Sequence, residues 1–240
     1  MDCYGFNLIH QIYGKKMWLL FPPEENLMPT RVPYEESSVY SRLNFFSPKI
    51  ENFKGLSSKC RKVELSPGDV LFVPHKWWHF VENLNTSIAI NVWLPSVHDD
   101  KERLKESIVQ YTVKQITDLS TEKTKKIILN PNMDKLLLKN DVTQFFNTIN
   151  TCKRICKRSP HKKQTNEDSS IFNTKIVDLG IEVPVLSRDE FMKLMNQQIS
   201  RFGEKKVPEE THGDDFVKLV RAFTNPEVIN LITHNLISDQ

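Results

Sequence analysis

The sequence predicts an α+β protein in which a β-rich segment, residues 1–95, precedes a mainly α-helical segment, residues 96–240. Two observations predict this class. Up to Leu94, short runs of β-branched and aromatic residues recur about every ten positions with turn residues between them, which is typical of a sandwich or barrel. After Pro95, apolar residues recur about every three to four positions, as on one face of an amphipathic helix.

The composition sets broad limits on function. The chain has 240 residues, of which 39% are hydrophobic and 26% charged, as in ordinary globular proteins. A net charge of +3 is too small over this length to indicate nucleic acid as a partner. The four cysteines follow no signal peptide and no apolar run approaches about 18 residues, so we expect reduced thiols, no membrane span and a cytosolic or nuclear location.

The first two expected strands form a hairpin. Residues 2–12 and 16–21 are rich in apolar residues, and residues 13–15 (YGK) between them supply a turn. The two prolines after Phe21 end the pair, because proline cannot donate a hydrogen bond to a central ladder. Residues 22–60 are then expected to be rich in loops.

The stretch from Ser66 to Glu82, SPGDVLFVPHKWWHFVE, holds the most informative pattern in the chain. A proline-glycine-aspartate turn precedes a short apolar strand that ends at Pro74, and a second strand carries His79 after two tryptophans. An imidazole among bulky rings needs a specific partner, so His79 is either a satisfied core residue or a ligand. The strands expected after the loops are residues 61–65, 70–73, 77–82 and 87–94.

The second segment is expected to contain helices on either side of a basic linker. Ser187, followed by an acidic first turn, is a suitable N-cap for one of them. We divide this segment into a helical extension (96–150), a basic polar linker (151–170) and a C-terminal helical region (171–240). The expected helices are residues 99–119, 121–130, 133–149, 188–202, 213–223 and 226–237.

Two apparent metal motifs do not meet the requirements of a site. Cys152 and Cys156 with His161 lack a closed set of four ligands for zinc, and the Lys- and Arg-rich run around them is better explained as a solvated surface linker. That run also permits nuclear import or nonspecific phosphate contact. His75 and His79 have helical zinc spacing, but strand geometry would separate them by about 13 Å.

The turn, strand, proline and Trp-Trp-His order within residues 66–82 resembles the C-terminal half of the metal site in Jumonji C (JmjC) proteins. Asp2 also fits the family's order, because a glycine-containing strand, Gly14-Lys15-Lys16, an apolar strand and Phe-Pro-Pro follow it. The resemblance covers residues 1–95. It implies the C-terminal portion of a cupin-like double-stranded β-helix, or jelly roll, of the kind that binds Fe(II) and 2-oxoglutarate in oxygenases.

The resemblance also implies the site residues. Asp2 and His79 would hold the metal, with their side chains converging from adjacent strands. Without the motifs that follow it, Asp2 would be interpreted as a solvent-exposed acidic residue near the N-terminus. Lys16, Asn7 and Asn91 would bind 2-oxoglutarate. The alternative for Lys16 is a lysine that faces solvent and has no role in binding. Trp93 would form the pocket wall. Asp2 and Asn7 differ by an odd number of positions, so both can face one pocket only if the strand is irregular between them, most simply by a bulge at Gly5.

One ligand of the family's triad has no counterpart in this sequence. The first histidine of the family's His-x-Asp motif would lie immediately before Met1, and His10 lies about 26 Å along a strand from Asp2. The site needs two imidazoles and one carboxylate. We therefore expect the chain as numbered to be N-terminally truncated, to bind Fe(II) weakly and to lack turnover.

Two functions follow from the resemblance. The first is oxygenase chemistry, in which a protein side chain or methyl group is hydroxylated. The family carries out this chemistry with three metal ligands, of which this chain has two. The alternative is a non-catalytic JmjC-derived binding module that engages a small heat-shock protein in a stress response. The blocks at residues 33–41 (PYEESSVYS) and 67–79 resemble the branch of the family associated with small heat-shock proteins.

Overall fold

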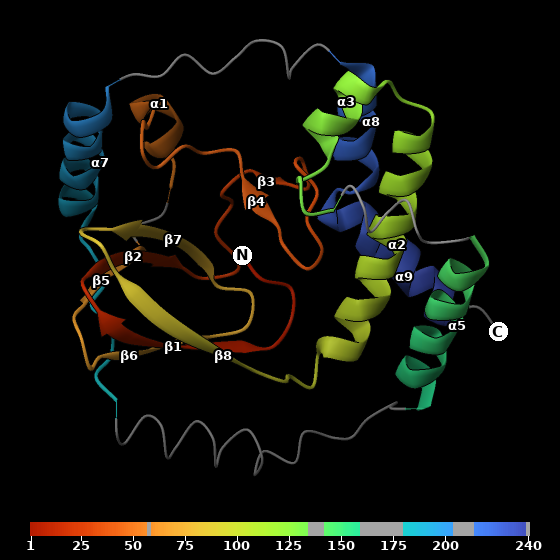
Figure 1. The fold of residues 1–240 in the computed structure, drawn as a ribbon, viewed down its shortest axis with the longest axis horizontal. Coiled ribbons are helices and arrows are strands. Elements are labelled where there is room, and N and C mark those ends of the chain that lie inside the picture. Colours follow the sequence, from red (N-terminus) through yellow and green to blue (C-terminus); the bar gives the residue numbers. More distant parts are fainter. Residues whose placement is uncertain (57–58, 134–141, 159–179, 204–213, 239–240) are drawn as a thin grey trace.

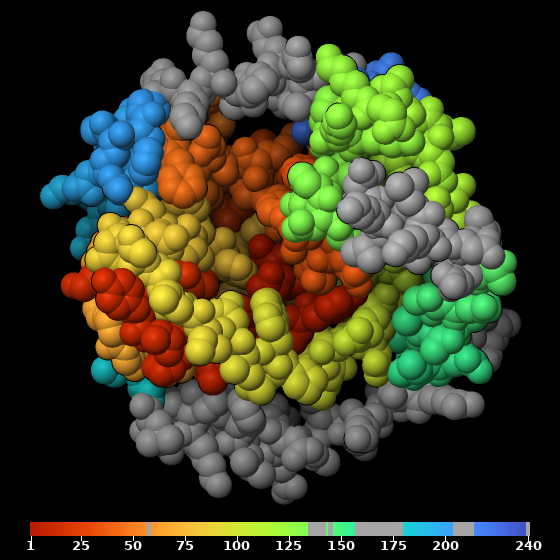
Figure 2. Space-filling model, viewed as in Figure 1, coloured from red at the N-terminus to blue at the C-terminus, as the bar shows by residue number. Residues whose placement is uncertain are grey.

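The structure is a computed structural model that describes residues 1–240 except 57–58, 134–141, 159–179, 204–213 and 239–240. Within the described residues, a β-rich half lies beside a helical half (Figure 1). The last strand ends at Leu94 and the first long helix begins at Asp99, which confirms the predicted α+β class. Figure 2 shows that the face in view is hollowed near its centre, where the N-terminal residues (red) meet the loops drawn in orange.

Two antiparallel sheets, each of three strands among the described residues, make up the β-rich half. In the first sheet, β1 (Phe6–Tyr13) lies between β6 (Val70–Val73) and β8 (Ile88–Leu94). In the second, β2 (Lys16–Phe21) lies between β5 (Arg61–Leu65) and β7 (Trp78–Asn83). The short elements β3 (Pro29–Thr30), β4 (Tyr40–Ser41) and α1 (Ile50–Phe53) lie in the loop-rich stretch before β5.

The two sheets face each other across a shared apolar core. Ile9 and Leu71 from the first sheet pack with Trp18, Leu20 and Leu65 from the second. Alternation along each strand brings these side chains to the inner faces, as expected of strands in a sandwich. The arrangement is the jelly-roll-like layering that the sequence predicts.

The turn between β1 and β2 depends on Gly14. This residue has a φ of +68°, and a Cβ there would lie 2.1 Å from the carbonyl oxygen of Thr86. A side chain therefore fits neither the backbone conformation nor the space. The hairpin predicted at residues 13–15 forms because glycine removes both conflicts.

Helix α7 (Arg188–Phe202) covers the outer face of the second sheet. Phe191 and Met195 pack on Leu19 and Phe21 of β2, in an apolar cluster separate from the core between the sheets. Ser187 caps the helix through a reciprocal capping box with Glu190, as its sequence predicts. The sequence places α7 in the C-terminal helical region, but in the structure it packs on the β-rich half (Figure 1).

The helical half has its own core around α2 (Asp99–Asp118). Side chains from α2, α8 and α9 meet there, among them Leu104, Val113, Val217 and Ile229. Tyr34, from the loop before β4, is fully buried in the same core and joins the two halves. The other helices of this half are α3 (Glu122–Ile128), α5 (Val142–Arg158), α8 (Asp215–Phe223) and α9 (Pro226–Ser238).

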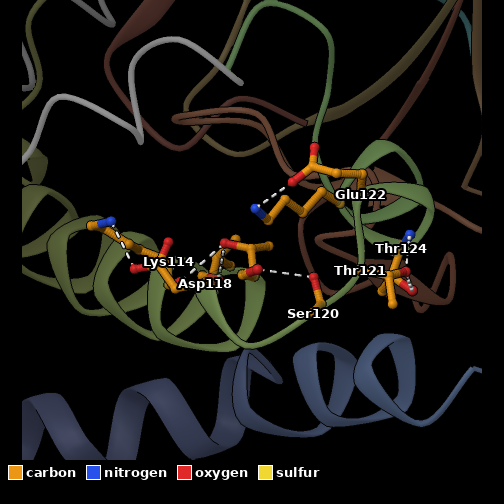
Figure 3. Close-up of polar contacts among 9 residues, drawn as sticks. Lys114, Asp118, Ser120, Thr121, Glu122 and Thr124 are labelled. Carbon is orange, nitrogen blue, oxygen red and sulfur yellow. Dashed lines mark hydrogen bonds and ion pairs between the residues drawn. The ribbon is translucent and has the colours of Figure 1, made fainter.

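Polar contacts direct the chain from α2 into α3 (Figure 3). Ser120 donates from its hydroxyl to a main-chain carbonyl in the last turn of α2 at 2.9 Å. Thr121 then caps α3 by accepting from the backbone N–H of Thr124 at 3.2 Å. The Thr124 hydroxyl donates to Asp214 at 2.7 Å, and Asp214 is the N-cap of α8. One short turn therefore fixes α3 against α8.

The basic run differs from its predicted linker conformation. The sequence predicts a helix over 133–149 and a linker over 151–170, but α5 continues to Arg158, with Lys153 half-buried and Arg154 exposed. Ile149, Cys152 and Cys156 pack against the core of the helical half at helical spacing, and this stripe carries the helix through the basic residues. The rest of the predicted linker lies outside the described residues. None of the described helices has the length and apolarity of a membrane span.

Candidate metal and co-substrate site

His79 lies on β7, where it is paired with Leu20 of β2. Its ring contacts that of Trp18 at a centroid distance of 5.8 Å. The Nδ1 atom lies 3.2 Å from the carbonyl oxygen of Trp77, which can only accept a hydrogen bond, so Nδ1 carries the proton. The lone pair of the neutral ring is then on Nε2.

Asp2 lies within reach of this nitrogen, because its Oδ2 is 3.5 Å from Nε2 of His79. The predicted convergence of the two side chains is confirmed. The prediction of adjacent strands is wrong, since Asp2 precedes β1 and forms an isolated bridge with Ser38. Backbone hydrogen bonds hold this segment, from Cys3 to Ser37 at 2.8 Å and from Val39 to Met1 at 2.9 Å.

These contacts give the block at residues 33–41 a structural role. In the sequence this block indicates only a branch of the family, yet in the structure it holds the segment that carries Asp2. Backbone pairing between segments so far apart along the chain has no local signature in the sequence. The resemblance locates Asp2, and the structure shows how it is held.

Asp2 and His79 line one cavity of about 350 Å³. Phe21, Leu27 and Phe45 form its apolar wall, and hydroxyl-bearing residues from 38–41 line another part of it. A polar pair at the edge of a mostly apolar cavity is the usual composition of a small-molecule site.

Burial shapes the protonation of the imidazole. Desolvation is the largest cause that lowers the pKa of His79 below its ordinary value, and the positive charge of the N-terminus lowers it further. The carboxylate of Asp2 acts in the opposite direction without reversing the shift. The imidazole is therefore neutral near pH 7, which is the form that binds a metal ion.

Lys16 lies on the inner face of β2, at the opposite end of the strand from Leu20. It is half-buried and lies four positions before Leu20, the partner of His79, or about 13 Å along the strand. Its ammonium makes no ion pair with the described residues. Lys16 does not line the cavity of Asp2 and His79, so any contact with a molecule there requires its long side chain to extend along the strand.

Asn7 and Asp2 line a common space that His79 does not line. Its side chain is buried, and its Oδ1 has no hydrogen-bond partner in the described part of the chain. Asn7, Asp2, Trp77 and Trp93 line a narrow space of about 10 Å³. A buried amide oxygen without a donor is costly, so a bound molecule that donates a hydrogen bond to Oδ1 would stabilise this side chain.

The irregularity predicted between Asp2 and Asn7 is present. Gly5 has a φ of +56°, and a Cβ there would lie 2.3 Å from the carbonyl oxygen of Leu94. The irregularity is a bend before β1 rather than a bulge within the ladder. It allows Asp2 and Asn7 to face the same space despite their odd spacing.

The resemblance implies that Asn91 faces the co-substrate pocket, but the structure does not place it there. Asn91 is exposed on β8, because β8 is an edge strand of its sheet and pairs with β1 alone among the described strands. Trp93 is 51% exposed, and it stands opposite Asn7 in the strand pairing. The structure brings Trp93 to the space beside Asn7, as a partial wall, and leaves Asn91 outside both cavities.

A complete metal site is absent from the described residues, which contain no group of three His, Cys, Asp or Glu side chains able to hold one ion. The nearby His75 is engaged otherwise, since its Nδ1 donates to the carbonyl of Gly5 at 3.2 Å and its ring stacks on His98.

Comparison with known proteins places this site in a family context. The model of the cupin-like domain family matches residues 2–100. The chain is 42% identical to HSPB1-associated protein 1 of Bos taurus over 135 residues, which cover 55% of the chain and 28% of that relative. It is 38% identical to the Homo sapiens protein of the same name over 156 residues, or 63% of the chain and 30% of that relative.

A more distant similarity points to the same domain. JmjC domain-containing protein 8 of Homo sapiens is 33% identical over 85 residues, covering 35% of the chain and 28% of that relative. The chain thus spans about 30% of the length of the curated relatives it matches. The region of similarity includes the segments that carry Asp2 and His79.

Proposed function

We propose that residues 2–100, which match the cupin-like domain family and are similar to JmjC domain-containing proteins, carry two of the three metal ligands of an Fe(II)- and 2-oxoglutarate-dependent oxygenase site. The observation that supports the proposal is the 3.5 Å approach of Asp2 Oδ2 to His79 Nε2 at the edge of a cavity. A carboxylate and a neutral imidazole are two of the ligand types that non-haem iron takes in such sites.

The residues fit the metal in part. Asp2 and His79 supply an oxygen and a nitrogen donor, whereas the family's site needs a second imidazole, and the described residues offer none in reach. The chain by itself is therefore proposed to bind a divalent ion weakly and to lack turnover. No catalytic step is assigned to it.

The protein groups would act by positioning. Trp77 would keep the proton of His79 on Nδ1 and so leave Nε2 free, and residues 37–39 would hold Asp2 in place. The amide nitrogen of Asn7 and the ammonium of Lys16 would offer hydrogen-bond donors to the oxygens of 2-oxoglutarate. In a complete site, Fe(II) with 2-oxoglutarate supplies the oxidising chemistry that hydroxylates a protein substrate.

The test is a calorimetric titration of the full chain with Fe(II) under anaerobic conditions, together with an assay for succinate. We expect weak binding in the unmodified chain, a loss of about tenfold or more in His79→Gln and in Asp2→Asn, and no succinate above background. His10→Gln is the matched control, because His10 is an exposed imidazole on β1. Unchanged binding in His79→Gln would refute the ligand assignment. Succinate formation that depends on His79 would refute the proposed lack of turnover.

The second candidate is a non-catalytic module that binds a small heat-shock protein. The names of the similar proteins from Bos taurus and Homo sapiens record an association with HSPB1. An apolar patch on the outer face of the first sheet suits such a role: Ile88, Ile90 and Val92 of β8 and Val70 of β6 are each at least half exposed. Exposed apolar patches on a sheet are typical of protein-binding surfaces.

Binding of purified HSPB1 to the full chain tests this candidate. Ile90→Lys should weaken binding by about tenfold, because a charge would be desolvated in the interface. Leu119→Lys, at an exposed apolar position near the end of α2, should leave binding unchanged, as should His79→Gln. Absence of binding, or equal weakening by both lysine variants, would exclude this surface as the docking site.

A further inference from the structure

A second cavity, of about 140 Å³, lies at the junction between the two halves of the molecule. Arg31 and Cys3 line it from the β-rich half, and α2 contributes Glu102, Lys105 and Glu106. The chain between α8 and α9 closes its remaining side. Met1 and Val39 line both this cavity and the one at His79, but the polar groups of the two differ.

The side chains around this second cavity carry more positive than negative charge. Arg31, Lys76, Lys105 and Arg221 are four cations, while Glu102 and Glu106 are two anions, so four minus two leaves a surplus of two positive charges. Glu102 accepts from Lys76 at 2.6 Å and from Lys105 at 2.9 Å, and Glu106 pairs with Arg31. Arg221 makes no ion pair with the described residues.

Two guanidinium groups here retain buried donors. Arg31 is 5% exposed, and its terminal nitrogens are engaged by Glu106, a backbone carbonyl and the sulfur of Cys3. Its Nε–H has no partner in the described part of the chain, and neither has the Nε–H of Arg221. A buried, charged donor without an acceptor is costly, so an acceptor supplied by a bound anion would stabilise both groups.

The end of α9 adds a further attraction for an anion. This helix of 13 residues begins at Pro226, and Asn225 caps it by accepting from the backbone N–H of Glu227 at 2.8 Å. Asn225 and Pro226 line the cavity, so the positive end of the helix dipole lies at its edge. Asn225 and Asn230 also place amide groups at the cavity.

From the buried, unpartnered guanidinium donors, the charge surplus and the helix end, we propose that this junction cavity binds a phosphate group. A phosphate carries close to two negative charges near neutral pH, which matches the surplus. Its oxygens accept several hydrogen bonds, and charged guanidinium donors are strong partners for them. The cavity is smaller than the roughly 300–1,000 Å³ of sites for drug-sized molecules, so it suits inorganic phosphate or the phosphate of a small monoester.

Calorimetric titration of the full chain tests this proposal, with ionic strength held constant by sodium chloride. One arm uses inorganic phosphate, a second uses glycerol phosphate, and a third uses succinate as a dicarboxylate of similar charge. We expect saturable binding of at least one of the two phosphate compounds, and the preferred one identifies the source of the group. Succinate is expected to bind about tenfold more weakly or not at all.

Two variants with matched controls probe the cavity. Arg221→Gln removes a donor that lines it, and we expect about a tenfold loss of phosphate affinity; Lys218→Gln removes an exposed charge from the same helix and should have no effect. Asn230→Asp adds a negative charge to the lining and should also weaken binding, whereas Asn235→Asp, on the same helix outside the cavity, should not.

Several outcomes would overturn the proposal. These are no binding of either phosphate compound, equal weakening by the lining and control variants, and succinate binding as strong as phosphate binding. Circular dichroism establishes that each variant is folded. His79→Gln is expected to leave phosphate binding unchanged, so a failure of the metal proposal and a failure of this one give different results.

Discussion

Glu102 shows how single buried charges connect the two halves of the molecule. Lys76, before β7, and Lys105, on α2, both donate to its carboxylate. Burial raises the pKa of Glu102, but the hydrogen bonds and charges of the two lysines outweigh burial and leave it below the ordinary value of 4.5. The ionised carboxylate therefore stabilises the folded state.

The sign of the resulting pH dependence follows from that lowered pKa. The stabilisation by Glu102 is complete above pH 4.5 and is lost as the pH falls through the lower pKa of the folded state. We expect Glu102→Gln to reduce the free energy of unfolding by about 1–3 kcal/mol at neutral pH. The difference from the unmodified chain should shrink in acid, as measured by urea unfolding at a series of pH values. A difference that stays constant with pH would contradict this assignment.

At the same scale, the sequence predicts the conformation or burial of a residue when its neighbours along the chain determine it. It does not predict these properties when residues far apart in the sequence determine them. Gly14 is predictable because the turn it makes lies between two adjacent strands. Asn91 looks buried in its apolar run, but its exposure depends on the position of β8 at the sheet edge. Arg31 and Glu106 are 75 positions apart, so their buried pair has no signature in the sequence.

At the scale of elements, α7 is the clearest case of a well-predicted helix in an unexpected place. Its bounds, Arg188–Phe202, follow from the cap at Ser187 and the apolar period. Its packing on β2 could not be foreseen, because an amphipathic period shows that a helix has a partner without identifying it. For the helix predicted at 133–149, the C-terminal boundary is wrong. The prediction ended the helix at the basic run, but Ile149, Cys152 and Cys156 form an apolar stripe that continues through it.

The placement of α7 leads to a prediction about stability. Met195 is fully buried against the outer face of the second sheet, so Met195→Ala should lower the free energy of unfolding by about 2–5 kcal/mol. Asn196→Ala, at the next and exposed position, should change it little. Urea unfolding followed by tryptophan fluorescence reports on the β-rich half, which contains Trp18 and Trp78. If Met195→Ala left that transition unchanged, α7 would not be part of the folding unit of the sheet.

At the scale of the whole molecule, the fold places two polar sites on either side of the N-terminal segment. One cavity contains Asp2 and His79, and the other contains Arg31 with residues of α2 and the α8–α9 junction. The sequence predicts the first because Asp2 and His79 lie in motifs that resemble those of a known family. It could not predict the second, which exists only where the two halves meet.

The central claim is that Asp2 and His79 together hold a metal ion. The most direct test is nuclear magnetic resonance of the histidine rings while Mn(II), a paramagnetic ion, is added below stoichiometric amounts. We predict that the ring signals of His79 broaden first, that those of His10 and His234 are little affected, and that Asp2→Asn removes the selective effect. Broadening that is spread over all histidines, or that persists at His79 in Asp2→Asn, would contradict the claim.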